Sequence, residues 1–232
     1  MATRDHAREL ADVAAALAAE HGKELTTAMI CKLAVEVIGP CDHASITIRS
    51  KRGRFRTTAA SSQIAEDLDA HQYELTDGPC LSSVEGGEVV FSADLDAESR
   101  WPGWTTRATG ARVGTVMSIP LRGDGGLIGS MNLYGHRPGS WDVDSREVAL
   151  LYATHAAIAM DAAQVASGLH TANASRHQIG LAQGILMQRY GLSVAQAFAV
   201  LQRYSSSTNT KLTTVAAEVV RDLDGEYSDG VA

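Results

Sequence analysis

Charged side chains near the C-terminal end of the chain point to a polyanionic partner. The whole chain is acidic, with 27 Asp and Glu residues against 20 Lys and Arg and a formal net charge of −7. Between residues 171 and 221 the balance is reversed, because the one acidic residue is Glu218. The basic residues of this segment are Arg176, Arg189, Arg203, Lys211 and Arg221. This local positive excess favours contact with nucleic acid here, and the overall charge excludes a general nucleic-acid coat.

Three short helices are expected to carry these basic residues. Apolar side chains recur at helical spacing from Ile179 to Met187, and Gly191 is a natural C-terminal stop. Ser193 can then cap a second helix, and a polar break at residues 205–209 separates it from a third. The apolar residues of the second and third helices are Ala197, Phe198, Leu201, Leu212, Val215, Ala216, Val219 and Val220. Three helices with one apolar face each can enclose a single small core.

This segment resembles the ANTAR domain, the three-helix RNA-binding module of bacterial transcription antiterminators, over roughly residues 168 to 225. The matching residues are Ala182-Gln-Gly-Ile-Leu-Met187, Arg189, Gly191, Ala197-Phe198, Leu201, Arg203, Asn209, Lys211-Leu212 and Val215-Ala216. The resemblance implies binding of paired small stem-loops in nascent RNA, which blocks terminator formation. The RNA-binding residues that it implies are Ala182, Gln183, Gly184, Arg189, Arg203, Asn209 and Lys211. The family usually has lysine where this chain has Gln183, so one phosphate-neutralising charge is absent.

The first 140 residues carry an α+β pattern. Two helices are expected over residues 4–20 and 24–38, followed by strands at 44–49 and 55–60. Two further strands, 115–121 and 127–134, flank the Gly-rich segment Arg122-Gly-Asp-Gly-Gly126, which predicts a hairpin. The expected fold is therefore an antiparallel sheet flanked by helices, a long connecting helix and a C-terminal three-helix bundle.

The N-terminal region resembles a GAF domain over about residues 22 to 165. The stretches that carry the resemblance are Leu75-Thr-Asp-Gly-Pro-Cys80, Asp94, Arg100-Trp-Pro102, Ile119-Pro-Leu121 and Ile128-Gly-Ser-Met-Asn-Leu-Tyr134. A GAF fold would bring Asp77, Cys80 and Asp94 near its pocket, which implies a small-molecule sensor whose ligand the sequence does not name. Trp101 and Trp104 fit two interpretations equally well: walls of a ligand pocket, or plugs at the open end of a small sheet.

Catalytic and metal-binding roles find little support in the sequence. Cys80 follows Gly78-Pro79 at a predicted helix start, where the helix dipole lowers the pKa of a thiol. The alternative, a small buried apolar residue that opens a helix, is favoured. No base with an orienting partner stands at a recognisable spacing, so no enzyme and no catalytic residue is expected. The eight histidines are scattered without a ligand pattern, so no metal and no certain cofactor is expected.

Residues 142–190 read as one nearly unbroken helix with a heptad repeat. One core position holds Leu151, Ile158, Val165, Ala172, Ile179 and Leu186, and the other holds Val148, His155, Ala162 and Leu169. Such a repeat predicts a coiled-coil seam and a homodimer. The alternative for the first two turns is a helix that packs on its own domain's sheet. Gly168 lies within the repeat and would soften the helix there.

The expected order is an N-terminal helix at 1–21, a GAF-like sensor at 22–165, an ANTAR-like domain at 166–227 and a tail at 228–232. Three irregularly spaced cysteines fit a reducing cytoplasm. The first ten residues lack the apolar core of a signal peptide, and no apolar run long enough to span a bilayer is recognised. The sequence therefore predicts a cytoplasmic protein without a membrane partner.

Together these features predict a signal-responsive RNA-binding antiterminator, in which a GAF sensor controls an ANTAR module. Two alternatives stay open. The first is a DNA-binding regulator with a helix-turn-helix-like C-terminal bundle, although the second helix offers only Gln196, Gln202 and Arg203 for base readout. The second is a GAF dimer that acts only through protein partners.

Overall fold

The computed structural model describes residues 23–50 and 52–229, and the chain divides into two units, residues 1–165 and 166–232. The helix expected over residues 4–20 lies outside the described residues. So does the end of the tail expected over 228–232, where the description stops at Asp229.

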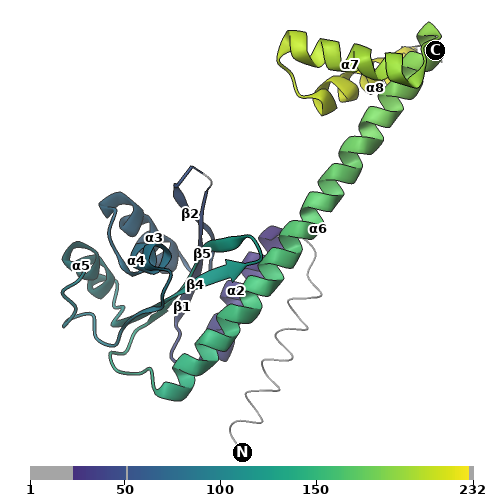
Figure 1. Cartoon of the computed structure of the whole chain (residues 1–232). Helices are drawn as coiled ribbons and strands as arrows, with labels where there is room; N and C mark the ends of the chain where they lie inside the picture. Colours follow the sequence, from purple (N-terminus) through teal and green to yellow (C-terminus); the bar gives the residue numbers. More distant parts are fainter. Residues whose placement is uncertain (1–22, 51, 230–232) are drawn as a thin grey trace, which may run out of the picture. The chain divides into compact units, whose positions relative to one another are not determined.

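Five antiparallel strands form the centre of the first unit (Figure 1). They lie in the order β2-β1-β5-β4-β3, with the bounds β1 His43–Arg49, β2 Phe55–Ala60, β3 Val90–Ser92, β4 Thr115–Gly123 and β5 Gly126–Gly135. The Gly-rich segment forms the expected hairpin, in which Gly123 pairs with Gly126 across the turn. The predicted α+β class is confirmed. The three-residue strand β3 was not predicted, because it is too short to show a period.

Helices cover both faces of this sheet. Their bounds are α2 Lys23–Val37, α3 Gln63–Leu75, α4 Pro79–Gly86, α5 Pro102–Gly110 and α6 Val143–Tyr190. Helices α2 and α6 lie on one face, and α3, α4 and α5 lie on the other (Figure 1). The sequence did not predict α3 or α5. Helix α3 begins at the N-cap Ser62, whose hydroxyl accepts from the backbone N–H of Ala65.

The face under α2 and α6 is the apolar core of the first unit. Inward-facing strand residues such as Ile46, Met131 and Leu133 are fully buried there against both helices. The Tyr152 hydroxyl of α6 donates to the Ile30 carbonyl of α2 at 2.7 Å and so ties the two helices together. Burial of this apolar face stabilises the packing of the first part of α6 on the sheet.

Helix α6 is long and apolar enough, by length and composition alone, to cross a membrane. This corrects the expectation that no such stretch exists. The stretch was not recognised in the sequence because its apolar residues are interleaved with small ones and form no continuous run. Ala149, Tyr152, Ala153, Ala156 and Met160 are buried against the sheet, as in the core helix of a globular domain.

The second unit holds the end of α6 with α7 (Val194–Thr208) and α8 (Leu212–Asp229). Gly191 ends α6 with a φ of 65°, and Ser193 forms a capping box with Gln196 at the start of α7. The predicted polar break at 205–209 is wrong, because α7 continues through Thr208. The Thr208 hydroxyl donates back to the Tyr204 carbonyl at 2.8 Å, and Asn209 ends the helix with a φ of 51°.

One small core joins these three helices. Its buried members are Ala182, Leu186, Ala197, Leu201, Val215 and Ala216. They come from the apolar positions that the sequence marked on each helix. The three-helix arrangement is therefore confirmed.

Candidate functional site

The sheet face under α3 and α4 is polar although it is completely buried. Its residues are Ser45, Thr47, Ser118, Ser130, Asn132 and Tyr134. They alternate along β1, β4 and β5 with the apolar residues of the opposite face, and Asn132 pairs directly with Ser45 on one side and Ser118 on the other. A sheet covered on both sides usually shows apolar residues on both. Buried polar side chains are therefore the first sign of a site.

Asp69 of α3 is the centre of a hydrogen-bond network on this face. Its carboxylate accepts from the Tyr134 hydroxyl at 2.7 Å, the Thr57 hydroxyl at 2.8 Å and the Asn132 amide at 3.1 Å. The Tyr73 hydroxyl lies 2.9 Å from the Thr57 hydroxyl and completes the cluster at the β2 edge. The Thr47 hydroxyl of β1 also donates to this carboxylate at 3.4 Å, so three strands and α3 meet at Asp69.

Asp69 is fully buried, and its partners among the described residues are neutral donors. Burial raises the pKa of Asp69, and the donors from Tyr134, Ser45, Thr57 and Thr47 lower it in part. The Ser118 hydroxyl, also fully buried, has no hydrogen-bond partner in the described chain. Hydrogen-bonding capacity therefore remains on this face.

The stability of the protein should depend on pH through Asp69. Because its pKa is raised in the folded state, Asp69 contributes stability below its ordinary pKa of 3.8, and this contribution is lost as the pH rises through the folded-state pKa. Asp69→Asn cannot ionise. The free energy of unfolding of the variant relative to wild type should therefore increase as the pH rises above about 4. Urea unfolding of both proteins across this range measures it, and a constant difference would contradict the assignment.

Cys80 is a buried residue at the start of a helix, as the sequence favoured, and not an activated thiol. It is the second residue of α4 and fully buried. Burial and the nearby Asp69 carboxylate raise the pKa of Cys80 to about 12, which outweighs the helix dipole. Its backbone N–H donates to the Gln72 amide oxygen at 2.7 Å, so Gln72 joins α3 to the start of α4.

The two tryptophans lie in the core beneath α3 and α5. Trp104 is fully buried and donates from its indole N–H to the Leu68 carbonyl at 3.1 Å, and the Trp101 indole donates to the Ser82 hydroxyl at 3.0 Å. Their rings are arranged edge to face, with the ring centroids 6.4 Å apart. The other expected ligand residues, Asp77 and Asp94, are exposed in loops. The structure thus brings Cys80 and the tryptophans under the helices and leaves both aspartates at the surface.

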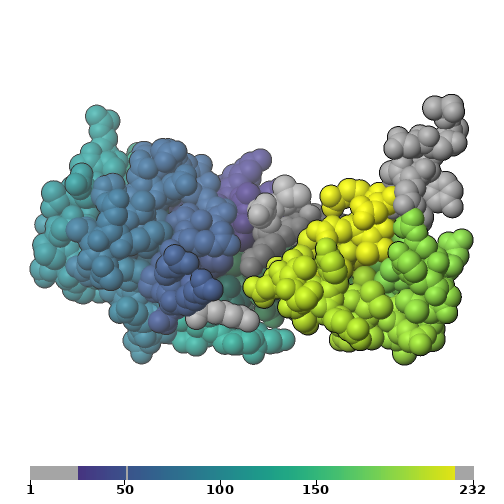
Figure 2. All heavy atoms as spheres, turned by 90° about the horizontal axis from the view of Figure 1, so that it is seen from above, coloured from purple at the N-terminus to yellow at the C-terminus, as the bar shows by residue number. Residues whose placement is uncertain are grey.

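The helices close this face off from solvent. The blue atoms of α3 and its neighbours form an unbroken surface in the view of Figure 2. Gln72 also fills the space beside Gly78, where a Cβ atom would lie 2.5 Å from its side chain. Gly78, with a φ of 143°, therefore has no room for a larger residue. Access to the polar face requires movement of the α3–α4 corner.

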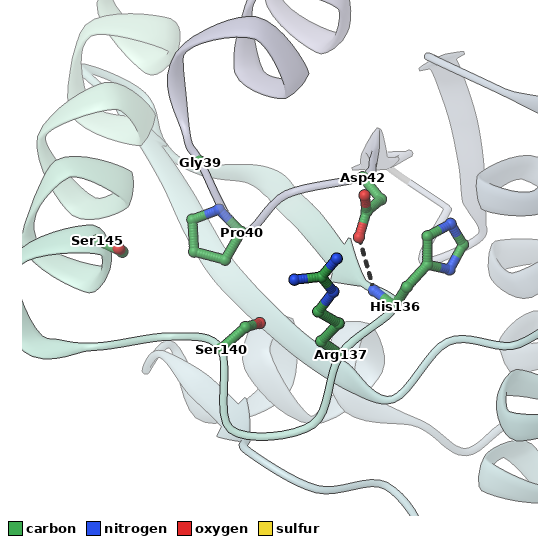
Figure 3. A pocket seen from close by; sticks show the side chains of 7 residues that line it. All are labelled: Gly39, Pro40, Asp42, His136, Arg137, Ser140 and Ser145. Atoms are coloured by element: carbon green, nitrogen blue, oxygen red, sulfur yellow. Dashed lines mark hydrogen bonds between the residues drawn. The ribbon is translucent and has the colours of Figure 1, made fainter.

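An open cleft of about 530 Å³ lies at the start of α6 (Figure 3). Its lining residues are Gly39, Pro40, Asp42, His136, Arg137, Ser140 and Ser145. The Asp42 carboxylate accepts from the His136 backbone N–H at 2.7 Å and joins the α2–β1 loop to the end of β5. This bond anchors the chain at the end of β5, seven residues before α6 begins at Val143.

The implied RNA-binding residues come from the last turns of α6, from α7 and from the turn that follows α7. Ala182 is buried in the core, so it can contribute through packing alone. Gln183 is half-buried and donates to the Val194 carbonyl at 3.3 Å, at the start of α7, whereas Gly184 and Arg189 are exposed. At the other end Arg203 lines a shallow groove of about 570 Å³ with Gln202, Ser205, Ser206 and Leu212. Exposed Asn209 and Lys211 form the adjoining turn.

Two exposed aromatic residues escaped the sequence reasoning. Tyr190 is 63% exposed and Tyr204 is 53% exposed, and each follows an arginine, Arg189 or Arg203. An aromatic ring beside a basic side chain is a common platform for stacking nucleic-acid bases. The repeated Arg-Tyr pair in the sequence could have identified both tyrosines as candidates.

Comparison with known families matches both parts of the chain. The GAF domain family matches residues 24–161, more than half of the chain, and the ANTAR domain family matches residues 167–220. The chain belongs to the GAF domain family and carries an ANTAR domain. No curated protein matches the chain.

Solved structures resemble the GAF domain in fold. A bacteriophytochrome from R. palustris is 12% identical, with a TM-score of 0.61 over 85% of this chain and 46% of that one. The GAF domain of a phosphoenolpyruvate-protein phosphotransferase from Coxiella burnetii is 16% identical, with a TM-score of 0.56 over 70% and 96%. A free methionine-R-sulfoxide reductase from Neisseria meningitidis is 17% identical, with a TM-score of 0.52 over 69% and 91%.

These likenesses establish the fold alone, because the identities are only 12%, 16% and 17%. The combination of a GAF domain with an ANTAR domain is typical of regulators. Within the GAF domain the described residues form no cluster of three or more His, Cys, Asp or Glu side chains suited to a metal ion.

Proposed function

We propose that the protein is a signal-responsive transcription antiterminator, in which ligand binding to the GAF domain controls the binding of paired RNA stem-loops by the ANTAR domain. The observation that carries this proposal is the ANTAR match over residues 167–220, which coincides with the three-helix unit. The exposed basic residues of that unit suit RNA phosphates. An antiterminator would act in the cytoplasm, where bacterial transcripts are made.

We infer that the ligand is sensed on the polar face under α3 and α4. A preformed set of donors and acceptors around Asp69, with an unpartnered Ser118 hydroxyl, suits a small polar molecule. Cys80 would contact it from the start of α4. Trp101 and Trp104 would act as the wall behind the site, and Asp77 and Asp94 would act from the loops at its entrance. No catalytic step is assigned to these residues.

Strand β5 offers a direct route from this face to the long helix. Asn132 and Tyr134 face the polar network, whereas Met131 and Leu133 between them pack in the core shared with α6. A displacement of β5 by a ligand therefore also moves the surface on which α6 rests. The ligand can influence RNA binding only through a difference in its affinity for two arrangements of the helix.

Paired stem-loops call for two ANTAR domains, and α6 is the proposed dimer seam. Leu151, Ile158 and Val165 are 51%, 61% and 58% exposed and lie at heptad spacing opposite the buried face of α6. Leu169 at the second heptad position is 61% exposed. Val148, by contrast, packs against the sheet core, and Ile179 and Leu186 belong to the ANTAR core. The proposed seam is therefore shorter than the sequence repeat.

Gly168 tests the coupling through α6. The position is exposed within the helix, and a Cβ atom there would meet nothing within 4 Å. Gly168→Ala should stabilise the helix by about 1 kcal/mol. A stiffer connection holds the two ANTAR domains in place before RNA arrives, so affinity should rise, by up to about fivefold. Titration with paired stem-loop RNA measures this, and an unchanged dissociation constant in a stabilised variant would argue against coupling through this helix.

A further inference from the structure

The hairpin between β1 and β2 holds a concentration of positive charge that the sensing role does not explain. Five of the eight residues from 49 to 56 are Arg or Lys, and no acidic residue occurs between Asp42 and Glu66. This short segment holds a quarter of the chain's 20 basic residues, although the chain as a whole carries a formal charge of −7. We call Arg49, Arg52, Arg54 and Arg56 the hairpin patch.

The arginines of the hairpin patch are available to a partner. Arg49, Arg52, Arg54 and Arg56 are all exposed, and none forms an ion pair in the described part of the chain. The free end of the hairpin protrudes from the sheet (Figure 1). Lys51 adds to the charge of this sequence and lies outside the described residues.

The hairpin itself is a defined support for these charges. The Ser50 N–H donates to the Arg54 carbonyl at 2.8 Å, and the Arg54 N–H donates to the Ser50 hydroxyl at 3.0 Å. Arg54 directly precedes β2 and Arg56 is its second residue, so about 6.6 Å of extended chain separates their backbones. Successive phosphates of a nucleic-acid strand have a similar spacing. Like charges so close repel each other unless an anion lies between them.

We propose that the hairpin patch is a second RNA contact, which binds phosphates of the same transcript that the ANTAR domain recognises. The inference rests on the proposed antiterminator function. Guanidinium groups form paired hydrogen bonds with phosphate oxygens. On an acidic molecule, such a patch determines where the backbone of a long polyanion can follow the protein surface.

The chemistry of the hairpin favours RNA over an anionic membrane. A loop that inserts into a lipid surface presents exposed apolar side chains, and the described hairpin residues include no exposed large apolar residue. Phe55 is half-buried, stacks on the Tyr73 ring at 6.3 Å and is covered by the Arg49 guanidinium at 5.8 Å. Its ring packs against these two side chains and is therefore not available for insertion into a lipid surface.

The test is a salt titration of the full chain with a fluorescent RNA that holds two stem-loops and single-stranded flanks. Three variants are compared: Arg52→Ala, Arg54→Ala and Arg56→Ala combined; the same three positions changed to Lys; and a charge-matched control with Lys32→Ala, Arg107→Ala and Arg137→Ala. The hairpin alanine variant should lose roughly tenfold in affinity near 0.1 M salt, and its salt slope should fall by about two units. The lysine variant should keep most of the slope, and the control should match wild type.

A hairpin alanine variant that behaves like the control would overturn the proposal, provided that thermal melting shows both folded. Loss of RNA binding on replacing Arg189, Arg203 and Lys211, with no effect of the hairpin, would leave the antiterminator function standing and remove only this inference. Absence of RNA binding by wild type would remove both. Binding of the wild type to phosphatidylserine vesicles that the hairpin variant loses, while RNA affinity stays unchanged, would assign the patch to membranes instead.

Discussion

Replacing Arg189, Arg203 and Lys211 together by alanine is expected to weaken the binding of paired stem-loop RNA about hundredfold. Each side chain is exposed on the ANTAR unit, and each is proposed to neutralise one phosphate. A charge-assisted contact contributes on the order of 1 kcal/mol or more, so three together account for roughly this loss. The dependence of log affinity on log salt should fall by about two to three units.

The charge-matched control for this result is the combined Lys32→Ala, Arg107→Ala and Arg137→Ala variant, whose three exposed residues belong to the GAF domain. It changes the net charge equally and should keep wild-type affinity and salt slope. Circular dichroism must show the ANTAR variant as helical as wild type. Unaltered RNA affinity in a folded ANTAR variant would mean that these three residues do not form the RNA-binding surface.

Ile158→Glu is expected to convert the proposed dimer into a monomer. The side chain is 61% exposed on the outer face of α6, so the change leaves the core of the GAF domain intact. At a dimer seam it would place two carboxylates face to face without partners. Each buried unpaired charge costs several kcal/mol, so the dimer dissociation constant should rise at least roughly hundredfold. Light scattering at micromolar concentration measures the change.

Ser167→Glu is the matched control, because Ser167 is exposed on α6 and lies two residues, about 200° around the helix, from Leu169 of the seam. This variant should stay dimeric. The Ile158→Glu monomer should also lose the gain in affinity that paired stem-loops give over a single stem-loop. A dimeric Ile158→Glu protein would show that the subunits meet through a different surface.

Much of the fold could be predicted from short-range signals in the sequence. The Gly-rich turn at 122–126 fixed the β4–β5 hairpin, and Gly191 with Ser193 defined the α6–α7 junction, because these conformations depend on a few local residues. Helix α7 ran past its predicted end for the opposite reason. A serine run favours a break, yet Ser207 and Thr208 both donate back to the Tyr204 carbonyl and continue the helix.

The polar network of the GAF domain was beyond prediction because it depends on tertiary contacts. Asp69 and Asn132 are 63 residues apart, and α3 itself was not predicted, so nothing in the sequence marked their meeting. The same holds for Cys80. Its place at the start of α4 was foreseen, but the burial that raises its pKa follows from the packing of α4 on the sheet.

The most direct test of the proposed function is a binding titration of the full chain against three labelled probes: RNA with two stem-loops, RNA with one, and duplex DNA of the same sequence. We expect the two-stem-loop RNA to bind most tightly, with two chains for each RNA, and the DNA duplex to bind weakly and without sequence preference. Tighter binding to the duplex than to either RNA would contradict the account and favour a DNA-binding regulator. No binding to any of the three would favour a GAF dimer that acts through protein partners.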